Sequence, residues 1–371
     1  MRSMHSYDAI TIDTQTVEHN SFHFDGGLLA QLRQFKNTPT EILVSEIVYN
    51  EILKHLNEKT RSAKDNMESA HKRAILFGLA AEGTVAFPGE QPDTKVLPKA
   101  RLDAFLSAIG AEIIKFDEVP VREVVRRYFS SVPPFSGSGK KKSEFPDAIA
   151  LLSLEIWAKK NGKRILAASD DADWTAHAEK SERIDVVKTL ADALALFQRH
   201  AEEARAHVQK LLSDLQNGTQ KDLLEQFKQL IDRAISDHPI DAAADSSCYA
   251  ETDQVYLTYK GFQIIGDDSE YDFSIVHAGK DKIVAQVSME LNVRAEASFS
   301  LSTVYSVDGD EVPLGSVEVT RTDELAAEVL VTFEGDFALG EMEITEVEIV
   351  EAPNTIDFGY IEPDFGDMYE E

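Results

Sequence analysis

Five short apolar runs alternate with helical segments through the first 190 residues, and this alternation limits the fold more than any other feature of the sequence. Short apolar runs separated by segments of helical periodicity are typical of strands buried on both faces of a parallel sheet. Two parallel strands need a crossover connection between them, which a helix usually supplies. The sequence therefore predicts an α/β domain with a parallel five-stranded sheet in three layers. The expected strands cover residues 9–12, 41–45, 111–116, 164–168 and 183–187.

Helical periodicity fills the gaps between these runs. We expect one helix to start after Ser45, whose hydroxyl is placed to cap it. The other helices expected before the basic loop cover residues 27–35, 60–82, 95–110 and 121–130.

The stretch from Glu144 to Trp174 is the best-defined part of this domain. It predicts a buried helix that begins near Pro146. Proline has no backbone N–H, and in the first helical turn this group would have no partner within the helix. Asn161-Gly162 is typical of the C-terminal end of an α-helix, where a glycine takes the left-handed (αL) backbone conformation. A buried strand follows, and directly after it come Asp170, Asp171 and Asp173. Carboxylates at the C-terminal end of a parallel strand lie where open α/β sheets place their sites.

The second half of the chain has a different pattern of apolar and polar residues. Helix-favouring sequence runs from Leu190 to about Ile235, and the polar segment 237–247 is expected to be a linker. Period-two patterns then predict a small antiparallel β domain, a sandwich or a half-barrel. Its expected strands cover residues 255–259, 282–287, 297–305, 316–320, 327–333 and 342–349. We therefore divide the chain into an α/β domain at 1–200, helices and linker at 201–245, and an acidic β domain at 246–371.

The charge of the chain is concentrated in this second half. The formal net charge is −29, yet residues 1–200 carry 27 Lys and Arg against 28 Asp and Glu, while residues 201–371 carry 10 against 38. The first half is thus electrically compatible with nucleic acid and the second would repel it. Two interpretations of this charge stay open: it only keeps the β domain soluble, or it serves to bind a protein partner or to form a homo-oligomer.

Two further features set the expected location of the protein. No apolar run reaches the roughly 18–20 residues of a membrane span, so no membrane partner is expected. Cys248 is the only cysteine, which excludes a disulfide framework. Both features favour the cytoplasm.

Acidic residues occupy equivalent points of the α/β domain. Asp13 follows the first strand, Glu51 lies in the helix after the second, Asp147 starts a helix, and Asp171 follows the fourth strand. If the first strand is central in the sheet, all four converge on one edge. Carboxylates without His or Cys suit Mg²⁺ or Mn²⁺. Taken singly, Asp147 could instead be an N-terminal dipole partner of its helix, and Asp13 a loop cap.

The sequence resembles the PIN-domain nucleases at these positions. The resemblance rests on Ile12-Asp13-Thr14, Ile47-Val48-Tyr49-Asn50-Glu51-Ile52, Phe145-Pro146-Asp147-Ala148 and Ser169-Asp170-Asp171-Ala172-Asp173-Trp174. It covers residues 8–200 and is closest to bacterial PIN-like proteins with a long helical insertion. It implies Mg²⁺- or Mn²⁺-dependent cleavage of RNA, or less often single-stranded DNA, leaving a 5′-phosphate and a 3′-hydroxyl. By family association it also suggests a toxin-like or antiviral defence effector.

The resemblance also assigns individual residues. It implies catalytic roles for Asp13, Glu51, Asp147 and Asp171, with Asp173 as a further metal ligand. Glu46 competes with Glu51, and the family pattern selects Asp171 over Asp170. Gln15 stands where the family often has Asn.

Basic and hydroxyl side chains near these acids are candidates for substrate binding. They are Lys140, Lys141, Lys142, Arg126, Arg127, Ser169 and Thr14. The basic residues could equally form a solvated face. His55, His71 and His177 lack the spacing of metal ligands, and we expect them at the surface.

Two alternative functions remain open. One is a catalytically weak PIN-like scaffold whose acidic β domain binds a protein. The other is a different phosphoryl-handling enzyme such as a phosphatase, which Asp13-Thr14-Gln15 disfavours because it lacks a second acid next to the first.

Overall fold

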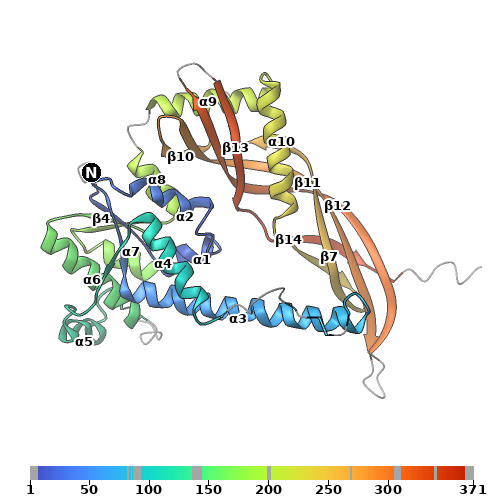
Figure 1. Ribbon diagram of the computed structural model, residues 1–371, viewed down its shortest axis with the longest axis horizontal. Helices are drawn as coiled ribbons and strands as arrows, with labels where there is room; N and C mark the ends of the chain where they lie inside the picture. Colours follow the sequence, from blue (N-terminus) through green and yellow to red (C-terminus); the bar gives the residue numbers. More distant parts are fainter. Residues whose placement is uncertain are drawn as a thin grey trace, which may run out of the picture. The chain divides into compact units, whose positions relative to one another are not determined.

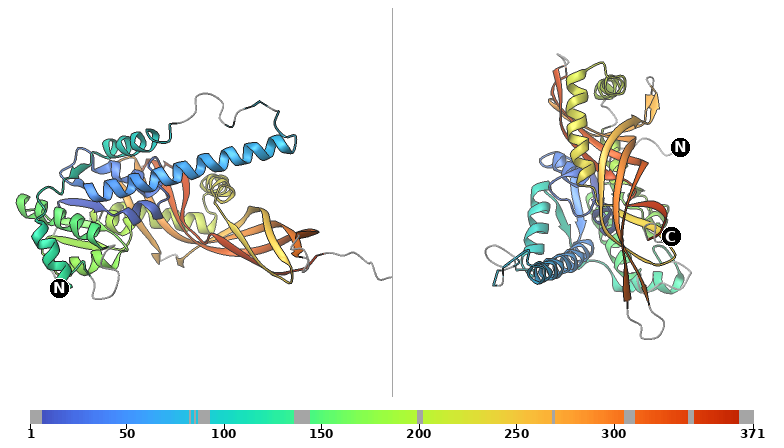
Figure 2. Two further views of the ribbon diagram at one scale, coloured as in Figure 1. Left: turned by 90° about the horizontal axis from the view of Figure 1, so that it is seen from below. Right: turned by 90° about the vertical axis from the view of Figure 1, so that its right-hand side faces the viewer.

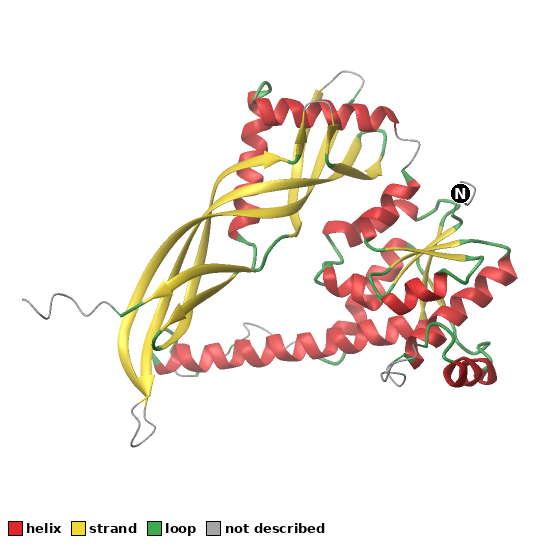
Figure 3. Cartoon of the chain, turned by 180° about the vertical axis from the view of Figure 1, so that it is seen from behind, coloured by secondary structure: helices red, strands yellow, loops and turns green. Residues whose placement is uncertain are grey.

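The computed structural model describes residues 7–363 except 82, 85, 87–92, 136–143, 199–201, 268–269, 305–310 and 338–340. The chain divides into two compact units, Met1–Phe197 and Gln198–Glu371. Figure 1 labels most helices and several strands of both units, and Figure 3 separates helices from strands by colour. Within the residues that the structure describes, none of the helices has the length and apolar character needed to cross a membrane.

A parallel five-stranded sheet forms the centre of the first unit, as the sequence predicts (Figure 3). The spatial order is β3-β2-β1-β4-β5, so the first strand is central. It pairs with β2 on one side and with β4 on the other. The strands are β1 (Ala9–Ile12), β2 (Glu41–Ser45), β3 (Glu112–Ile114), β4 (Ile165–Ala168) and β5 (Ile184–Val187).

Helices cover this sheet and complete the three layers. Helix α6 contacts β2 and β3, while α8 contacts β4 and β5. The apolar side chains of β1, β2 and β4 are buried on both faces, which explains why these strands read as short uninterrupted apolar runs. The helices are α1 (Thr14–His19), α2 (Gly27–Gln31), the 3₁₀ turn η1 (Leu32–Phe35), α3 (Glu46–Leu76), α4 (Leu97–Ile109), α5 (Val121–Ser130), α6 (Phe145–Asn161), α7 (Ala172–Ala178) and α8 (Leu190–Phe197).

Helix α3 corrects one expectation. The prediction of a separate helix over residues 60–82 is wrong, because residues 46–76 form one continuous helix of 31 residues (Figure 2). No glycine or proline interrupts it. Only its first part is buried, through Val48, Ile52 and Leu56. The remainder is polar and carries i,i+4 ion pairs, which stabilise an exposed helix modestly.

The second unit contains an antiparallel sheet, again as predicted. Its main order is β10-β11-β12-β13, with β7 paired to β11 as well. The strands of the unit are β6 (Asp241–Ser246), β7 (Tyr249–Ile264), β8 (Gly266–Asp267), β9 (Glu270–Tyr271), β10 (Phe273–Ala278), β11 (Lys282–Val304), β12 (Glu311–Asp336), β13 (Glu341–Glu351) and β14 (Thr355–Ile361).

Three details of this unit differ from expectation. The strand expected at 282–287 and residues 297–304 of the strand expected at 297–305 are parts of β11, while residue 305 lies outside the described residues. The strands expected at 316–320 and 327–333 are parts of β12. The expected linker at 237–247 is also wrong, because residues 241–246 form β6, which pairs in parallel with β14. Its alternating half-buried alanines explain the strand, since they face the core.

Two helices, not a second sheet, cover one face of this antiparallel sheet. They are α9 (Glu202–Asn217) and α10 (Lys221–Ser236). Their apolar residues share one core with the odd-numbered residues of β11, such as Leu291 and Phe299. Phe227 of α10 is fully buried there, with its ring 4.8 Å from that of Phe262. The helices after residue 201 are therefore part of the second unit.

Candidate metal and nucleic-acid site

The acidic residues follow the strands at the point where the strand order of the sheet reverses. From β1 the chain moves outward to β2 and β3, and it then returns to β4 on the other side of β1. Ligand sites of open α/β sheets lie at such a reversal, beyond the C-terminal ends of the strands. Asp13 follows β1 directly, and Asp171 stands three residues after the end of β4.

Asp13 is held by two parts of the chain, the start of α1 and the residue that follows β4. Its Oδ1 accepts a hydrogen bond from the Thr16 backbone N–H at 2.6 Å, and its Oδ2 accepts one from the Ser169 hydroxyl at 2.5 Å. Burial raises the pKa of Asp13, these hydrogen bonds lower it, and the charge of Asp171 raises it further. Asp13 is thus the cap of α1 and, at the same time, a buried acid beside another carboxylate.

Asp147 lies in the first turn of α6, where its Oδ1 accepts a hydrogen bond from the Trp174 indole N–H at 3.1 Å. Burial raises its pKa to about 7, and the hydrogen bond from Trp174 opposes this change. The charges of Asp171, Glu51 and Asp173 raise the pKa further. These carboxylates, drawn from three helices, therefore lie close enough to repel one another.

In each of the two pairs of competing acids, the two carboxylates have different partners. Glu51 accepts a hydrogen bond from the Thr14 hydroxyl at 2.8 Å, which ties it to the end of β1. Glu46 instead forms an ion pair with Lys115 at 2.7 Å. Only Glu51 is therefore tied to the cluster by a hydrogen bond.

The two competing acids after β4 also have different partners. Asp171 caps α7 by accepting from the Asp173 backbone N–H at 2.6 Å, and its own N–H donates to Ser169 at 3.1 Å. The exposed Asp170 forms an ion pair with Lys188 at 3.5 Å. Asp171 thus faces the acidic cluster, and Asp170 points to a surface lysine.

Glu144 is an acid that sequence reasoning missed. It is buried, with 5% of its surface exposed, and stands at the N-terminal boundary of α6. Burial raises the pKa of Asp173 to about 6, and the charges of Asp171 and Glu144 add to this increase. The only signal in the sequence was its place two residues before Pro146 in the acidic motif.

The donor set fits a hard divalent cation, although the side chains are not yet gathered around one point. Among the described residues, no three His, Cys, Asp or Glu side chains converge as a metal site. The hydrogen bonds described above use Oε2 of Glu51, Oδ1 of Asp147 and Oδ1 of Asp171. Oxygen ligands of this kind suit Mg²⁺ and Mn²⁺.

Comparison with known protein families identifies the domain that carries these acids. Residues 10–174 match the family model of the PIN domain. The N-terminal unit of this chain is a PIN domain. The matched segment runs from β1 to Trp174 and so contains every acid of the cluster. A PIN domain is a nuclease-type fold whose members generally depend on divalent metals and act on nucleic acid. No curated protein and no solved structure gave a match to the chain.

Of the basic residues expected to bind substrate, the structure describes Arg126 and Arg127, both in α5. Lys140, Lys141 and Lys142 lie outside the described residues. Arg126 is exposed on α5 and forms an ion pair with Glu123 at 2.6 Å. The hydroxyls of Thr14 and Ser169 donate to Glu51 and Asp13, so the structure places both beside the carboxylates of the PIN domain.

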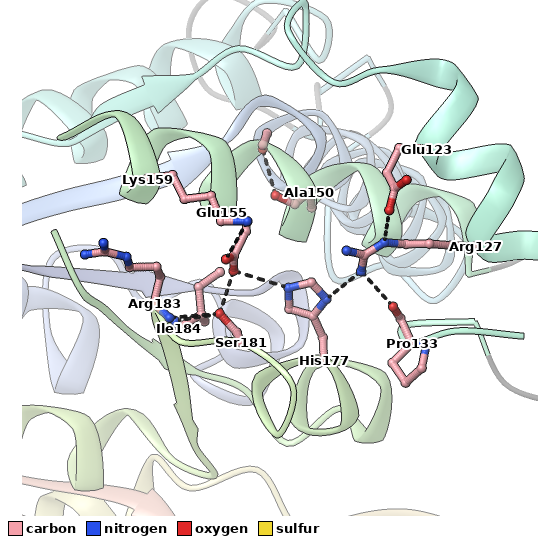
Figure 4. A network of polar contacts seen from close by, with 11 residues as sticks. Glu123, Arg127, Pro133, Ala150, Glu155, Lys159, His177, Ser181, Arg183 and Ile184 are labelled. Atoms are coloured by element: carbon pink, nitrogen blue, oxygen red, sulfur yellow. Dashed lines mark hydrogen bonds and ion pairs between the residues drawn. The ribbon is translucent and has the colours of Figure 1, made fainter. Parts of the chain in front are cut away.

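Arg127 belongs to a network of polar contacts that joins α5 to α6 and α7 (Figure 4). Its guanidinium donates to the Pro133 carbonyl at 2.9 Å and contacts Nδ1 of His177 at 3.4 Å. Since arginine can only donate, Nδ1 is the acceptor and the ring proton is on Nε2. Nε2 in turn faces Glu155 at 3.7 Å.

This network corrects the expectation that His177 is a surface residue. His177 is buried, and so is Glu155 (Figure 4). Burial would raise the pKa of Glu155, but His177 and the Ser181 hydroxyl, which donates at 2.5 Å, lower it to about 2. Through His177, Arg127 links α5 to α7, the helix that contains Asp173 and is capped by Asp171.

Proposed function

We propose that this protein is a Mg²⁺- or Mn²⁺-dependent endoribonuclease that hydrolyses phosphodiester bonds with a metal-activated water. The observation that carries the proposal is the crowding of Asp13, Glu51, Asp147 and Asp171 at the reversal of the strand order, with the pKa of Asp147 raised to about 7. Such repulsion costs free energy in the unliganded protein, and a divalent cation would relieve it.

The residues of the chain have distinct parts in this proposal. Asp13, Glu51, Asp147 and Asp171 would hold the cation, with Asp173 as a further ligand. The bound ion would supply a nucleophilic hydroxide at neutral pH and would stabilise charge on the phosphoryl oxygens. Ser169, Thr14 and Trp174 keep three of the carboxylates in place through hydrogen bonds.

We further propose RNA as the preferred substrate, ahead of single-stranded DNA. The support is the resemblance of the four acidic motifs to PIN-domain nucleases. A cytoplasmic role in defence, with the acidic second unit binding a basic protein or a second copy of the chain, extends this proposal and rests on family association and charge alone.

Incubation of the purified protein with single-stranded RNA and DNA, in Mg²⁺, Mn²⁺ or EDTA, tests the proposal. Cleavage should require the metal and should be lost in Asp147→Asn and Glu51→Gln. The matched controls are Asp170→Asn and Glu46→Gln, which remove neighbouring carboxylates that pair with lysines. Equal loss in control and test variants would refute the assignment of these acids.

A catalytically weak scaffold is the second candidate. It is favoured by one observation, that no three acids among the described residues converge as a ready metal site. Titration with Mn²⁺, followed by calorimetry, distinguishes the two. Binding that disappears in Asp147→Asn supports the nuclease, and absence of binding supports the scaffold.

A further inference from the structure

Helix α5 exposes an apolar stripe that its own domain leaves uncovered. Val121, Val125 and Phe129 recur at four-residue spacing and are all exposed, with 78% of Phe129 accessible. The opposite side of the helix is anchored, since Val124 and Tyr128 pack in the cluster that contains Phe135 and Leu152. Because the buried side fixes the helix, its outer face is a preformed surface.

Arginines accompany this stripe. Arg122 and Arg126 are exposed and each follows an apolar residue of the stripe by one position. Glu123 pairs with both Arg126 and Arg127, and their hydrogen bonds lower its pKa to about 2, so it stays charged. Helix α5 contains three arginines and a single carboxylate, so it keeps an excess of positive charge.

A chain of aromatic rings connects this face to the acidic cluster. The ring of Phe129 lies 5.2 Å from that of Tyr128, and Tyr128 lies 4.9 Å from Phe145. Phe145 begins α6 and stands two residues before Asp147. The exposed ring is thus two ring contacts away from the helix turn that carries the central acid of the site.

We propose that this face of α5 binds single-stranded nucleic acid next to the cleavage site, with a base stacked on Phe129 and phosphates on Arg122 and Arg126. The inference rests on the proposed function, because it places the substrate of that site. An exposed aromatic ring between cations is the combination that binds single strands without sequence preference. An acidic protein segment could also meet the charges, but α5 packs against α6, whose first turn carries Asp147, and this places the face near the proposed cleavage site.

The test measures binding in EDTA, so that cleavage does not intervene. Labelled oligouridylate and oligothymidylate are titrated against the full-length protein, Phe129→Ala and the double variant Arg122→Ala/Arg126→Ala. Phe129→Ala should weaken binding about 5- to 30-fold, whereas Phe129→Tyr should retain it. The double variant should reduce the slope of log affinity against log salt by about 1 to 2.

Two matched controls come from α3 and its end. Phe77→Ala removes an equally exposed phenylalanine, 74% accessible, and Arg61→Ala removes an exposed arginine that is also ion-paired. Phe77 lies 26 residues beyond Glu51, about 39 Å along the helix axis. Both controls should bind the strands as the wild type does.

Affinity unchanged in Phe129→Ala and in the double variant overturns the proposal. A lower molar mass of Phe129→Ala than of the wild type, measured in solution without nucleic acid, also overturns it. That result would show that this face of α5 joins two copies of the chain. The outcomes are separable from those of the proposed function. Strand binding through α5 without metal-dependent cleavage refutes the nuclease alone, and cleavage with unaffected α5 variants refutes the α5 site alone.

Discussion

Replacing Asp147 by asparagine should stabilise the metal-free PIN domain above pH 7. The ordinary pKa of the carboxyl is 3.8, and in the folded protein burial and neighbouring carboxylates raise it to about 7. Between these values the folded state holds more protons than the unfolded state, so the free energy of unfolding falls as pH rises through this window. Asparagine carries no such charge, and its carbonyl oxygen can still accept from Trp174.

The size of the effect follows from that difference in pKa. At about 1.4 kcal/mol per pKa unit, the full penalty above pH 7 is about 4 kcal/mol. The side chain of Asp147 is only partly buried, so solvent screening reduces this limit. We expect a gain of about 2 kcal/mol, or about 4–8 °C in melting temperature, for Asp147→Asn at pH 8 in EDTA.

Tryptophan fluorescence is the natural assay. Trp157 and Trp174 are the two tryptophans of the chain, and both lie in the PIN domain, so the signal reports this unit alone. The gain should vanish near pH 4, where both proteins carry a neutral group at this position. Mn²⁺ should raise the melting temperature of the wild type more than that of the variant.

One result would refute the reasoning. If Asp147→Asn is less stable than the wild type at pH 8 in EDTA, the carboxylate stabilises the fold and its neighbours do not repel it. Asp170→Asn is the control, since its exposed carboxylate pairs with Lys188 and should change the melting temperature little.

Three other perturbations test separate parts of the structure. Ser169→Ala removes a hydrogen bond that lowers the pKa of Asp13, so Mn²⁺ binding measured by calorimetry should require a higher pH; an unchanged pH dependence contradicts this. Arg127→Met should cost about 1–3 kcal/mol in urea unfolding, because it leaves buried acceptors unpaired, and a loss below that range would show that the network is not stabilising. Truncation to residues 1–197 should give a soluble, folded protein by circular dichroism, whereas truncation to 1–245 should aggregate, because α9 and α10 would lose the sheet that buries them; equal solubility would contradict the assignment of these helices to the second core.

The strands of the first unit were predictable because they are buried on both faces. A strand such as β4, whose four residues are all buried, shows as an apolar run whatever its neighbours are. The places of two acids at the ends of strands were predictable for a related reason, since Asp13 directly follows β1 and Asp171 stands three residues after β4. Their mutual repulsion could not be read from the sequence, because it depends on side chains brought together by the strand order.

The long strands of the second unit show what was missed. In β11 the odd-numbered residues from Met289 to Leu301 are buried, while the residues between them are polar or charged. The prediction treated these polar residues as the end of a strand and so divided one strand into two. The alternation of buried and exposed residues, with a period of two, in fact continues through them. His177 was missed for another reason: its burial depends on Arg127 and Glu155, which lie 50 and 22 residues away in the sequence.

The central place of β1 also has a consequence for synthesis of the chain. Strand β1 is made first, but its partner β4 follows only after more than 150 residues, and the hydrogen bond between Asp13 and Ser169 spans 156. Contacts so distant in sequence close late in folding. On the ribosome, the carboxylates can meet only after Trp174 has left the exit tunnel. Until that moment a nascent chain carries no assembled acidic site, although it is close to the RNA on which it is made.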